Sequence, residues 1–162
     1  MTLHLDDRVE AITYADDTQL AISGPKDQIP EMIEILQSAL TRISEWFAEN
    51  RLKINAKKTQ LIMFGSRSML RNVHKISLRF DGSTITETRV VKNLGLHMDR
   101  YMTFSDHVSS VVAKCSGALI ALAHARHSLP DFVIKNIVNA LVVSSVRYCL
   151  AIYGTCSKTD LH

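Results

Sequence analysis

The sequence is poor in residues that cross-link or interrupt small folds: among 162 residues there are three cysteines, three prolines and six glycines. The odd number and wide spacing of Cys115, Cys149 and Cys156 argue against a disulfide framework and against a CxxC metal site. With 46% hydrophobic and 22% charged residues, the composition is neither that of a disordered chain nor that of a fibrous repeat. Most of the chain is therefore expected to fold, in a reducing environment.

Targeting signals are also lacking. The N-terminus has neither the basic start nor the apolar run of a signal peptide. The apolar stretch at 137–146 is interrupted by Asn139 and by Ser144-Ser145, and it is shorter than the roughly 20 residues that span a bilayer. We therefore expect no secretion, no membrane segment and an intracellular location.

Acidic residues are absent from one stretch of the chain. Residues 51–80 contain eight Lys or Arg side chains and no Asp or Glu, whereas residues 1–50 contain ten acidic and three basic side chains. One interpretation is a solvated face whose acidic partners come from elsewhere in the fold. The other is a polyanion-binding surface, because clustered basic side chains supply the sequence-independent part of nucleic-acid affinity.

The first fifty residues predict a hairpin followed by a helix. Two short runs rich in apolar and β-branched residues, 9–15 and 18–23, are joined by Asp16-Asp17, and aspartate tolerates the backbone angles of a tight turn. The acidic pair is therefore expected at the hairpin tip. From Ile29 onward, apolar side chains recur at intervals of three and four, which predicts a helix with Pro30 in its first turn and an exit at Asn50-Arg51.

The remaining segments predict strands and then helices. Strands are expected at 52–55, 59–64 and 90–98, and a hairpin over 75–88 turns at Asp81-Gly82. After residue 103 one helix begins with Ser105 or Asp106 as its cap, and Pro130 starts the next. This order predicts an α+β fold with a small helical module from about residue 104.

Adjacent carboxylates at a hairpin tip suit hard divalent cations, since Mg²⁺ prefers oxygen ligands and keeps waters that substrate phosphates replace. Asp16 and Asp17 meet this requirement of two-metal phosphoryl chemistry. Acidic pairs are also common in surface loops, and Asp6-Asp7 is expected to be plain surface. The choice between these two interpretations depends on the sequence around the pair.

Several blocks around and after this pair resemble those of reverse transcriptases of non-LTR, or LINE-type, retrotransposons. In chain order they are Tyr14-Ala15-Asp16-Asp17, similar to the YxDD box; Trp46 to Gly65, with Asn50-Arg51-Leu52-Lys53-Ile54-Asn55 and Lys57-Lys58-Thr59; Val91-Lys92-Asn93-Leu94-Gly95, followed by Asp99, Phe104 and His107; and Arg126 to Gly154, with Val142, Ser145 and Tyr148. The resemblance covers about residues 9–154, and this ordered set is far more specific than the acidic pair alone.

The resemblance implies a retrotransposon RNA-directed DNA polymerase with a partial palm and a helical thumb. Residues 1–103 would form the partial palm, with the YADD hairpin and the primer-grip region, and residues 104–162 the thumb-like region. The implied partners are an RNA template, a DNA primer and deoxynucleoside triphosphates. A group II intron reverse transcriptase fits the blocks less well.

The resemblance also assigns residues to roles. Asp16 is the more direct ligand of Mg²⁺ or Mn²⁺, and Asp17 supports the site. The residues expected near the primer are Tyr14, Ala15, Leu94 and Gly95. Leu94-Gly95 fits a tight turn that holds the primer strand, although Leu-Gly at a strand bend is also a routine structural feature. Lys58 is expected near the incoming triphosphate as an acid or charge stabiliser, with Lys57 and a purely electrostatic or surface role as the competing assignments.

A palm of this family needs a further aspartate on a strand well upstream of the YxDD box, and only 13 residues precede Tyr14. We therefore expect the chain by itself to be a fragment without polymerase activity, because a two-metal site that lacks a carboxylate holds its ions poorly. The alternatives are a non-catalytic nucleic-acid-binding protein and a decayed retroelement relic.

Overall fold

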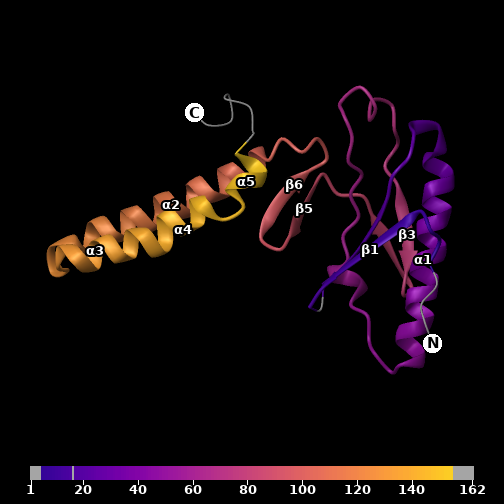
Figure 1. Ribbon diagram of the computed structural model, residues 1–162, viewed down its shortest axis with the longest axis horizontal. Helices are drawn as coiled ribbons and strands as arrows, with labels where there is room; N and C mark the ends of the chain where they lie inside the picture. The colour runs from indigo at the N-terminus through magenta and orange to yellow at the C-terminus, as the bar shows by residue number, and fades with distance from the viewer. Residues whose placement is uncertain (1–4, 16, 155–162) are drawn as a thin grey trace. The chain divides into compact units, whose positions relative to one another are not determined.

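The computed structural model describes residues 5–15 and 17–154, and it divides the chain into two compact units, Met1–Thr88 and Arg89–His162. Each unit combines antiparallel strands with helices, so the predicted α+β class is confirmed (Figure 1). The predicted boundary at residues 103 and 104 separates a palm from a thumb by function, and it stays a prediction.

The first unit opens with the predicted hairpin. Strand β1 (Val9–Tyr14) pairs antiparallel with β2 (Asp17–Ile22), with Val9 opposite Ile22 and Tyr14 opposite Asp17. Because side chains alternate between the faces of a strand, Val9 and Leu20 lie on one face and Ile12 and Tyr14 on the other. Val9 is buried, whereas Ile12 is 57% and Tyr14 64% exposed, so only the first face packs inward.

Helix α1 (Ile29–Glu49) follows a short 3-10 turn, η1 (Lys26–Gln28). Pro30 lies in the first turn as predicted, where its missing N–H costs no helical hydrogen bond. The buried Leu40 and Ile43 pack with Leu78 and Phe80 of β3 (Ser77–Phe80), the strand that lies beside α1 in Figure 1, and Ala39 is buried as well. The periodicity of the sequence thus predicted both the helix and its buried face.

The helix ends at the predicted place by a slightly different geometry. The side chain of Asn50 donates to the Trp46 carbonyl oxygen at 2.8 Å, while Arg51, not Asn50, takes the left-handed backbone with φ of 56°. Two backbone bonds complete a Schellman motif: Arg51 N–H to Ala48 O at 3.1 Å and Leu52 N–H to Phe47 O at 2.8 Å. The spacing of the Asn-x-Leu sequence therefore matches a helix C-cap.

The strands predicted at 52–55 and 59–64 are wrong. The chain forms another 3-10 turn, η2 (Ala56–Lys58), and then runs without regular structure except at Leu61, which makes an isolated parallel bridge with Glu87. The hairpin of β3 and β4 (Ser83–Thr86) is confirmed, with its predicted turn at Asp81 (φ 48°) and Gly82 (φ 70°).

The core of the first unit lies between α1 and the β3–β4 hairpin. Apolar side chains from the helix, from η2 and from both strands meet there: Leu40, Ile43, Ala56, Leu78, Phe80 and Ile85. Burying a side chain of the Leu, Ile or Phe type contributes about 1.5–3 kcal/mol. Leu20 and Leu61 are partly buried against this core and attach the β1–β2 hairpin and the irregular segment to it.

The second unit begins with a hairpin where the residue pattern predicted a single strand and where the family resemblance implied a tight turn at Leu94-Gly95. The pairing of β5 (Val90–Asn93) with β6 (Leu96–Asp99) is antiparallel, and Leu94-Gly95 forms the turn between them. Both turn residues have positive φ, 46° and 88°. Leucine at the first turn position, where asparagine or aspartate is usual, is why the strand pattern concealed the turn.

The sequence predicted Ser105 or Asp106 as the cap of helix α2 (Ser105–Ala125), and this prediction is wrong. Phe104 occupies the N-cap position with φ of 60°, and Ser105 is the first helical residue. The carboxylate of Asp99, at the end of β6, instead orders the loop that leads into the helix. Its oxygens accept hydrogen bonds from three donors of the connecting loop: Tyr101 N–H at 2.9 Å, the Thr103 hydroxyl at 2.9 Å and Phe104 N–H at 2.7 Å.

The remaining helices run back along α2 (Figure 1). After η3 (Arg126–Ser128), Pro130 is the N-cap of α3 (Asp131–Val138), as predicted. The helix continues through a π-helical segment, η4 (Asn139–Val143), into α4 (Ser144–Arg147), and a bend leads to α5 (Leu150–Tyr153). The buried Cys115 of α2 approaches this second layer, with its sulfur 3.8 Å from the Val142 carbonyl oxygen.

We expected no membrane segment, yet by length and composition one helix in the described part of the chain could span a membrane. Ser105–Ser128, with a mean hydropathy of 1.5, meets both criteria among the residues that the structure describes. Core helices, which are mostly buried, and signal sequences meet the same criteria; in α2, which packs along η4 and α4, only 11% of the 18-residue apolar window is buried. Length and composition alone therefore do not make α2 a membrane helix.

Candidate functional site

The tip of the β1–β2 hairpin carries the predicted acidic pair, of which Asp16 lies outside the described residues. Since Tyr14 pairs with Asp17, the connection consists of Ala15 and Asp16, and Ala15 has a φ of 54°. The predicted tip is thus shifted by one position, because Asp17 is the first residue of β2 and not part of the turn. Tyr14 and Asp17 are exposed on the outward face of the hairpin.

The described residues provide part of a divalent metal site. The exposed carboxylate of Asp17 fits as one oxygen ligand of a hard cation such as Mg²⁺. Within residues 5–15 and 17–154, no group of three or more His, Cys, Asp or Glu side chains is arranged to hold a metal ion. Further ligands would have to come from Asp16 or from groups outside the described residues.

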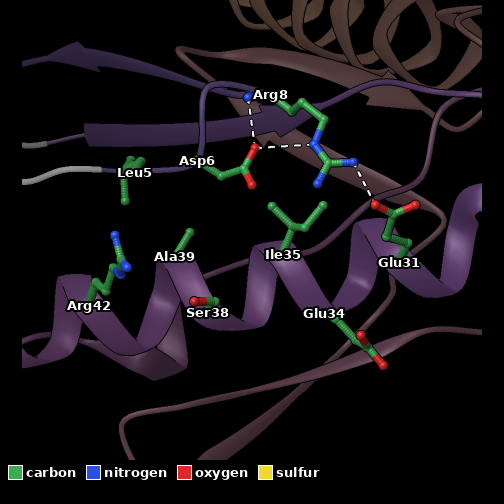
Figure 2. A pocket seen from close by; sticks show the side chains of 9 residues that line it. All are labelled: Leu5, Asp6, Arg8, Glu31, Glu34, Ile35, Ser38, Ala39 and Arg42. Carbon is green, nitrogen blue, oxygen red and sulfur yellow. Dashed lines mark hydrogen bonds and ion pairs between the residues drawn. The ribbon is translucent and has the colours of Figure 1, made fainter.

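The second acidic pair, Asp6-Asp7, is exposed as expected, but Asp6 is not a free carboxylate (Figure 2). Its Oδ1 accepts hydrogen bonds from the Arg8 N–H at 2.9 Å and from Arg8 Nε at 3.2 Å. Arg8 Nη1 in turn donates to Glu31 Oε1 at 2.7 Å. The hydrogen bonds from Arg8 lower the pKa of Asp6. The Asp6 carboxylate is therefore bound to the guanidinium group of Arg8.

This ion-pair network anchors the hairpin to α1. Arg8 immediately precedes β1, and Glu31 lies in the first turn of α1, so the Arg8–Glu31 pair joins the start of the hairpin to the start of the helix. The network lines an open pocket between the N-terminal segment and α1, together with Ile35 and Arg42 (Figure 2). The Arg8–Glu31 ion pair therefore holds the base of the hairpin against α1, and burial of Val9 fixes which face of the hairpin points inward.

Lys58 and its neighbour Lys57 lie on η2, and both are exposed. The Lys58 N–H donates to the Asn55 carbonyl oxygen at 3.0 Å, and the buried Ala56 packs the turn into the core. The side chains of both lysines therefore project from a fixed backbone. Neither lysine is bonded to Asp17 in the described part of the chain.

The cationic side chains of the basic segment, residues 51–80, are on the surface. All eight of its cationic side chains are exposed: Arg51, Lys53, Lys57, Lys58, Arg67, Arg71, Lys75 and Arg79. They come from the helix exit, η2, the irregular segment and β3. The structure thus places them where a polyanion has access.

The predicted pair Leu94 and Gly95 forms the β5–β6 turn, and Leu94 is 43% exposed. Sequence reasoning missed the side chain that lies on this turn, Tyr148, which it placed only within the helical block. The Tyr148 hydroxyl donates a hydrogen bond to the Leu94 carbonyl oxygen. No local pattern signals a contact across 54 residues.

Asp99, Phe104 and His107, which follow this turn in the third block, are all buried. Phe104 packs with Leu96 in the core of the second unit. Burial alone would raise the pKa of Asp99, but the hydrogen bonds from Tyr101, Thr103 and Phe104 outweigh it and lower that pKa. These residues shape the start of α2 and are structural.

The sequence profile of the family described as "Reverse transcriptase (RNA-dependent DNA polymerase)" matches residues 2–98. The "RNA-directed DNA polymerase from mobile element jockey" of Drosophila funebris is 29% identical over 154 residues, which is 93% of this chain and 16% of that protein. The jockey polymerase of Drosophila melanogaster is also 29% identical, over 157 residues and the same shares of both chains.

A third relative, the "Probable RNA-directed DNA polymerase from transposon BS" of Drosophila melanogaster, is 29% identical over 69% of this chain and 12% of its own. The chain thus spans about a sixth of the length of the jockey polymerases. No solved structure matches. Because the family profile covers well over half of the 162 residues, the chain belongs to the reverse transcriptase (RNA-dependent DNA polymerase) family.

Proposed function

We propose that this chain is part of a LINE-type retrotransposon reverse transcriptase and contributes the YxDD hairpin to RNA-directed DNA synthesis. Its family membership and its similarity to two jockey polymerases and a BS polymerase support the proposal. The observation that carries it is the exposed Tyr14–Asp17 pair at the end of the β1–β2 hairpin, whose strands are joined by two residues. In the proposed polymerase, residues 1–103 belong to the palm and residues 104–162 to a helical thumb.

In this proposal Asp16 and Asp17 hold Mg²⁺ or Mn²⁺. The bound ions would activate the attacking primer hydroxyl and stabilise the charge of the leaving pyrophosphate. The hairpin supplies what the ions need from the protein: a strand that fixes Asp17 on an exposed face and a base tied to α1 through Arg8. The small Ala15 leaves room for the primer end.

Lys58 and the β5–β6 turn have supporting roles. Lys58 projects from a backbone turn that is fixed by the buried Ala56, and it would offset the negative charge of the triphosphate. Leu94 and Gly95 would contact the primer strand through an exposed tight turn. The template, primer and nucleotides are the partners of the complete polymerase.

A chimeric polymerase tests the catalytic part of the proposal. Residues 1–154 would replace the matching segment of the Drosophila funebris jockey polymerase, and primer extension on an RNA template would be measured. Asp17→Asn is expected to reduce extension by about a hundredfold or more, since it removes a charge that acts on the transition state. Asp7→Asn, a change in the other acidic pair, is the matched control and should leave extension unchanged. Equal activity of the two variants would refute the assignment.

A non-catalytic nucleic-acid-binding protein is the second candidate, and the eight exposed cations of residues 51–80 favour it. Both candidates predict that the 162-residue chain binds a primer–template duplex with an affinity that falls as salt rises. Fluorescence anisotropy at increasing salt measures this, and salt-independent binding would contradict both. Loss of extension in the Asp17→Asn chimera then favours the polymerase over the binding protein.

A further inference from the structure

We propose that Tyr148 is a positioning residue that holds the Leu94–Gly95 turn in the shape that receives the primer strand. The inference rests on the role proposed above for this turn. It adds to that role a residue from the helical region, far from the turn in sequence and in contact with it in the fold.

Two contacts join Tyr148 to the turn. Its hydroxyl donates a hydrogen bond to the carbonyl oxygen of Leu94. Its ring lies beside Gly95, where an added Cβ would be 3.4 Å from Cε1 and 3.5 Å from the hydroxyl oxygen of Tyr148. The hydrogen bond therefore fixes the direction of one peptide group, and the ring limits the space beside the next residue.

The turn needs such support because of its backbone. Leu94 has a φ of 46°, a region that a leucine side chain disfavours, and the strands on either side are only four residues long. A two-stranded hairpin is marginally stable by itself. A contact from outside the hairpin thus shifts the turn toward one conformation.

The end of the helical region is built to present Tyr148. This residue has extended backbone (φ −62°, ψ 121°) and Cys149 has left-handed backbone (φ 56°), so the chain bends sharply between α4 and α5. After the bend, the buried Tyr153 packs its ring edge-on to His107 at 4.8 Å between centroids. Its hydroxyl donates to the Val146 carbonyl oxygen before the bend. The bend is thus held on both sides of Tyr148.

The contact is open to a ligand. Tyr148 is 49% and Leu94 43% exposed, so the turn and its support lie at the surface and not within the core. A tyrosine that served only as packing would be covered to a greater extent. Loss of its hydroxyl should therefore affect ligand binding more than folding.

The experiment uses the 162-residue chain with Tyr148→Phe, which removes one oxygen, and Tyr148→Ala, which also removes the ring. Hydrogen exchange is measured at the Leu96 amide, which closes a two-residue turn, and primer–template affinity is measured by anisotropy at low salt. Tyr148→Phe is expected to accelerate exchange about fivefold and to raise Kd about fivefold, the factor that corresponds to the loss of one hydrogen bond. Tyr148→Ala should exceed both effects.

Ser144→Ala is the matched control, because it removes a side-chain hydroxyl that donates to a helix carbonyl oxygen, that of Ala140, in the same segment. It should leave the Leu96 amide and Kd unchanged. Unchanged exchange in both Tyr148 variants overturns the inference, and so does faster exchange with unchanged Kd. Absence of binding by the wild-type chain overturns the proposed function itself. Binding that persists while the variants behave as wild type leaves that function standing without Tyr148.

Discussion

Asp99 is a buried carboxylate whose three donors all lie in the loop before α2. Asp99→Asn replaces one acceptor oxygen by an N–H₂ group that faces these donors. We expect it to destabilise the second unit by about 2 kcal/mol, the value for hydrogen bonds to a charged group. Urea unfolding followed by far-UV circular dichroism measures the loss.

The first unit provides the control for this change. It contains the single tryptophan, Trp46, so tryptophan fluorescence reports on that unit alone. The fluorescence transition should be the same in Asp99→Asn and in the wild type. Because the pKa of Asp99 is lowered by folding, its contribution is present above the unfolded pKa, about 3.9, and is lost as pH falls through the lower folded value.

His107 predicts a second dependence on pH, in a different window. Its Nδ1 accepts the His97 N–H at 3.4 Å, and its buried Nε2 has no hydrogen-bond partner among residues 5–15 and 17–154. Burial, and secondarily the neighbouring His97, lower the pKa of His107. Since the unfolded chain then binds a proton more readily than the folded one, stability should fall as pH drops below about 6.5, the ordinary histidine value.

The variant His107→Gln retains a hydrogen-bond acceptor but does not titrate. Between about pH 7 and pH 5, the free energy of unfolding of the second unit should fall less in this variant than in the wild type, measured by circular dichroism in urea. Identical slopes in both proteins would show that a group other than His107 controls the dependence.

Among the elements, α1 ends in a cap that is not optimal. Arg51 holds a left-handed backbone that costs an L-residue about 1–2 kcal/mol and costs glycine little. Arg51→Gly is expected to stabilise the first unit by about 1 kcal/mol, measured by urea unfolding with Trp46 fluorescence. Arg51→Ala removes the same charge without relieving the backbone, so it should not stabilise. A gain in both variants would point to charge repulsion instead.

The elements also show what local sequence can and cannot specify. The helices and the hairpins at Tyr14–Asp17 and Asp81-Gly82 follow from periodicity and turn residues, which are local properties. The segment 52–64 has the apolar residues of strands, yet its Leu61 finds only one bridge partner, Glu87. A strand requires a partner along its length, and local sequence does not reveal one.

In the candidate site, too, some features follow from the sequence and others do not. The acidic pair and the Leu94-Gly95 turn were found from sequence blocks, whereas the exact turn position at Ala15 depended on the pairing register of β1 and β2. The contact of Tyr148 with Leu94 arises only when segments 54 residues apart pack together. The hydrogen bonds of Asp99 reach only two to five residues along the chain, yet the sequence pattern did not reveal them. Specific side-chain support is therefore the part of the site that the sequence did not predict.

At the scale of the whole molecule, the 162-residue chain is expected to bind a primer–template duplex without extending it. Its described residues supply one exposed carboxylate at the hairpin tip and no complete group of metal ligands. Incubation of the purified chain with a primed RNA template, nucleotides and either Mg²⁺ or Mn²⁺ tests this. The jockey chimera serves as the positive control, and extension by the chain alone would contradict the prediction.

The π-helical segment at Asn139–Val143 accommodates one extra residue within its turn. A π turn contains one residue more than the α-helical turn it replaces, so deleting a single codon there would restore a continuous α-helix. Because that turn would close with one residue fewer, the residues beyond it would keep their direction around the helix axis. A gene copy with that deletion would retain its reading frame and its helical content, and Tyr148 would still face Leu94.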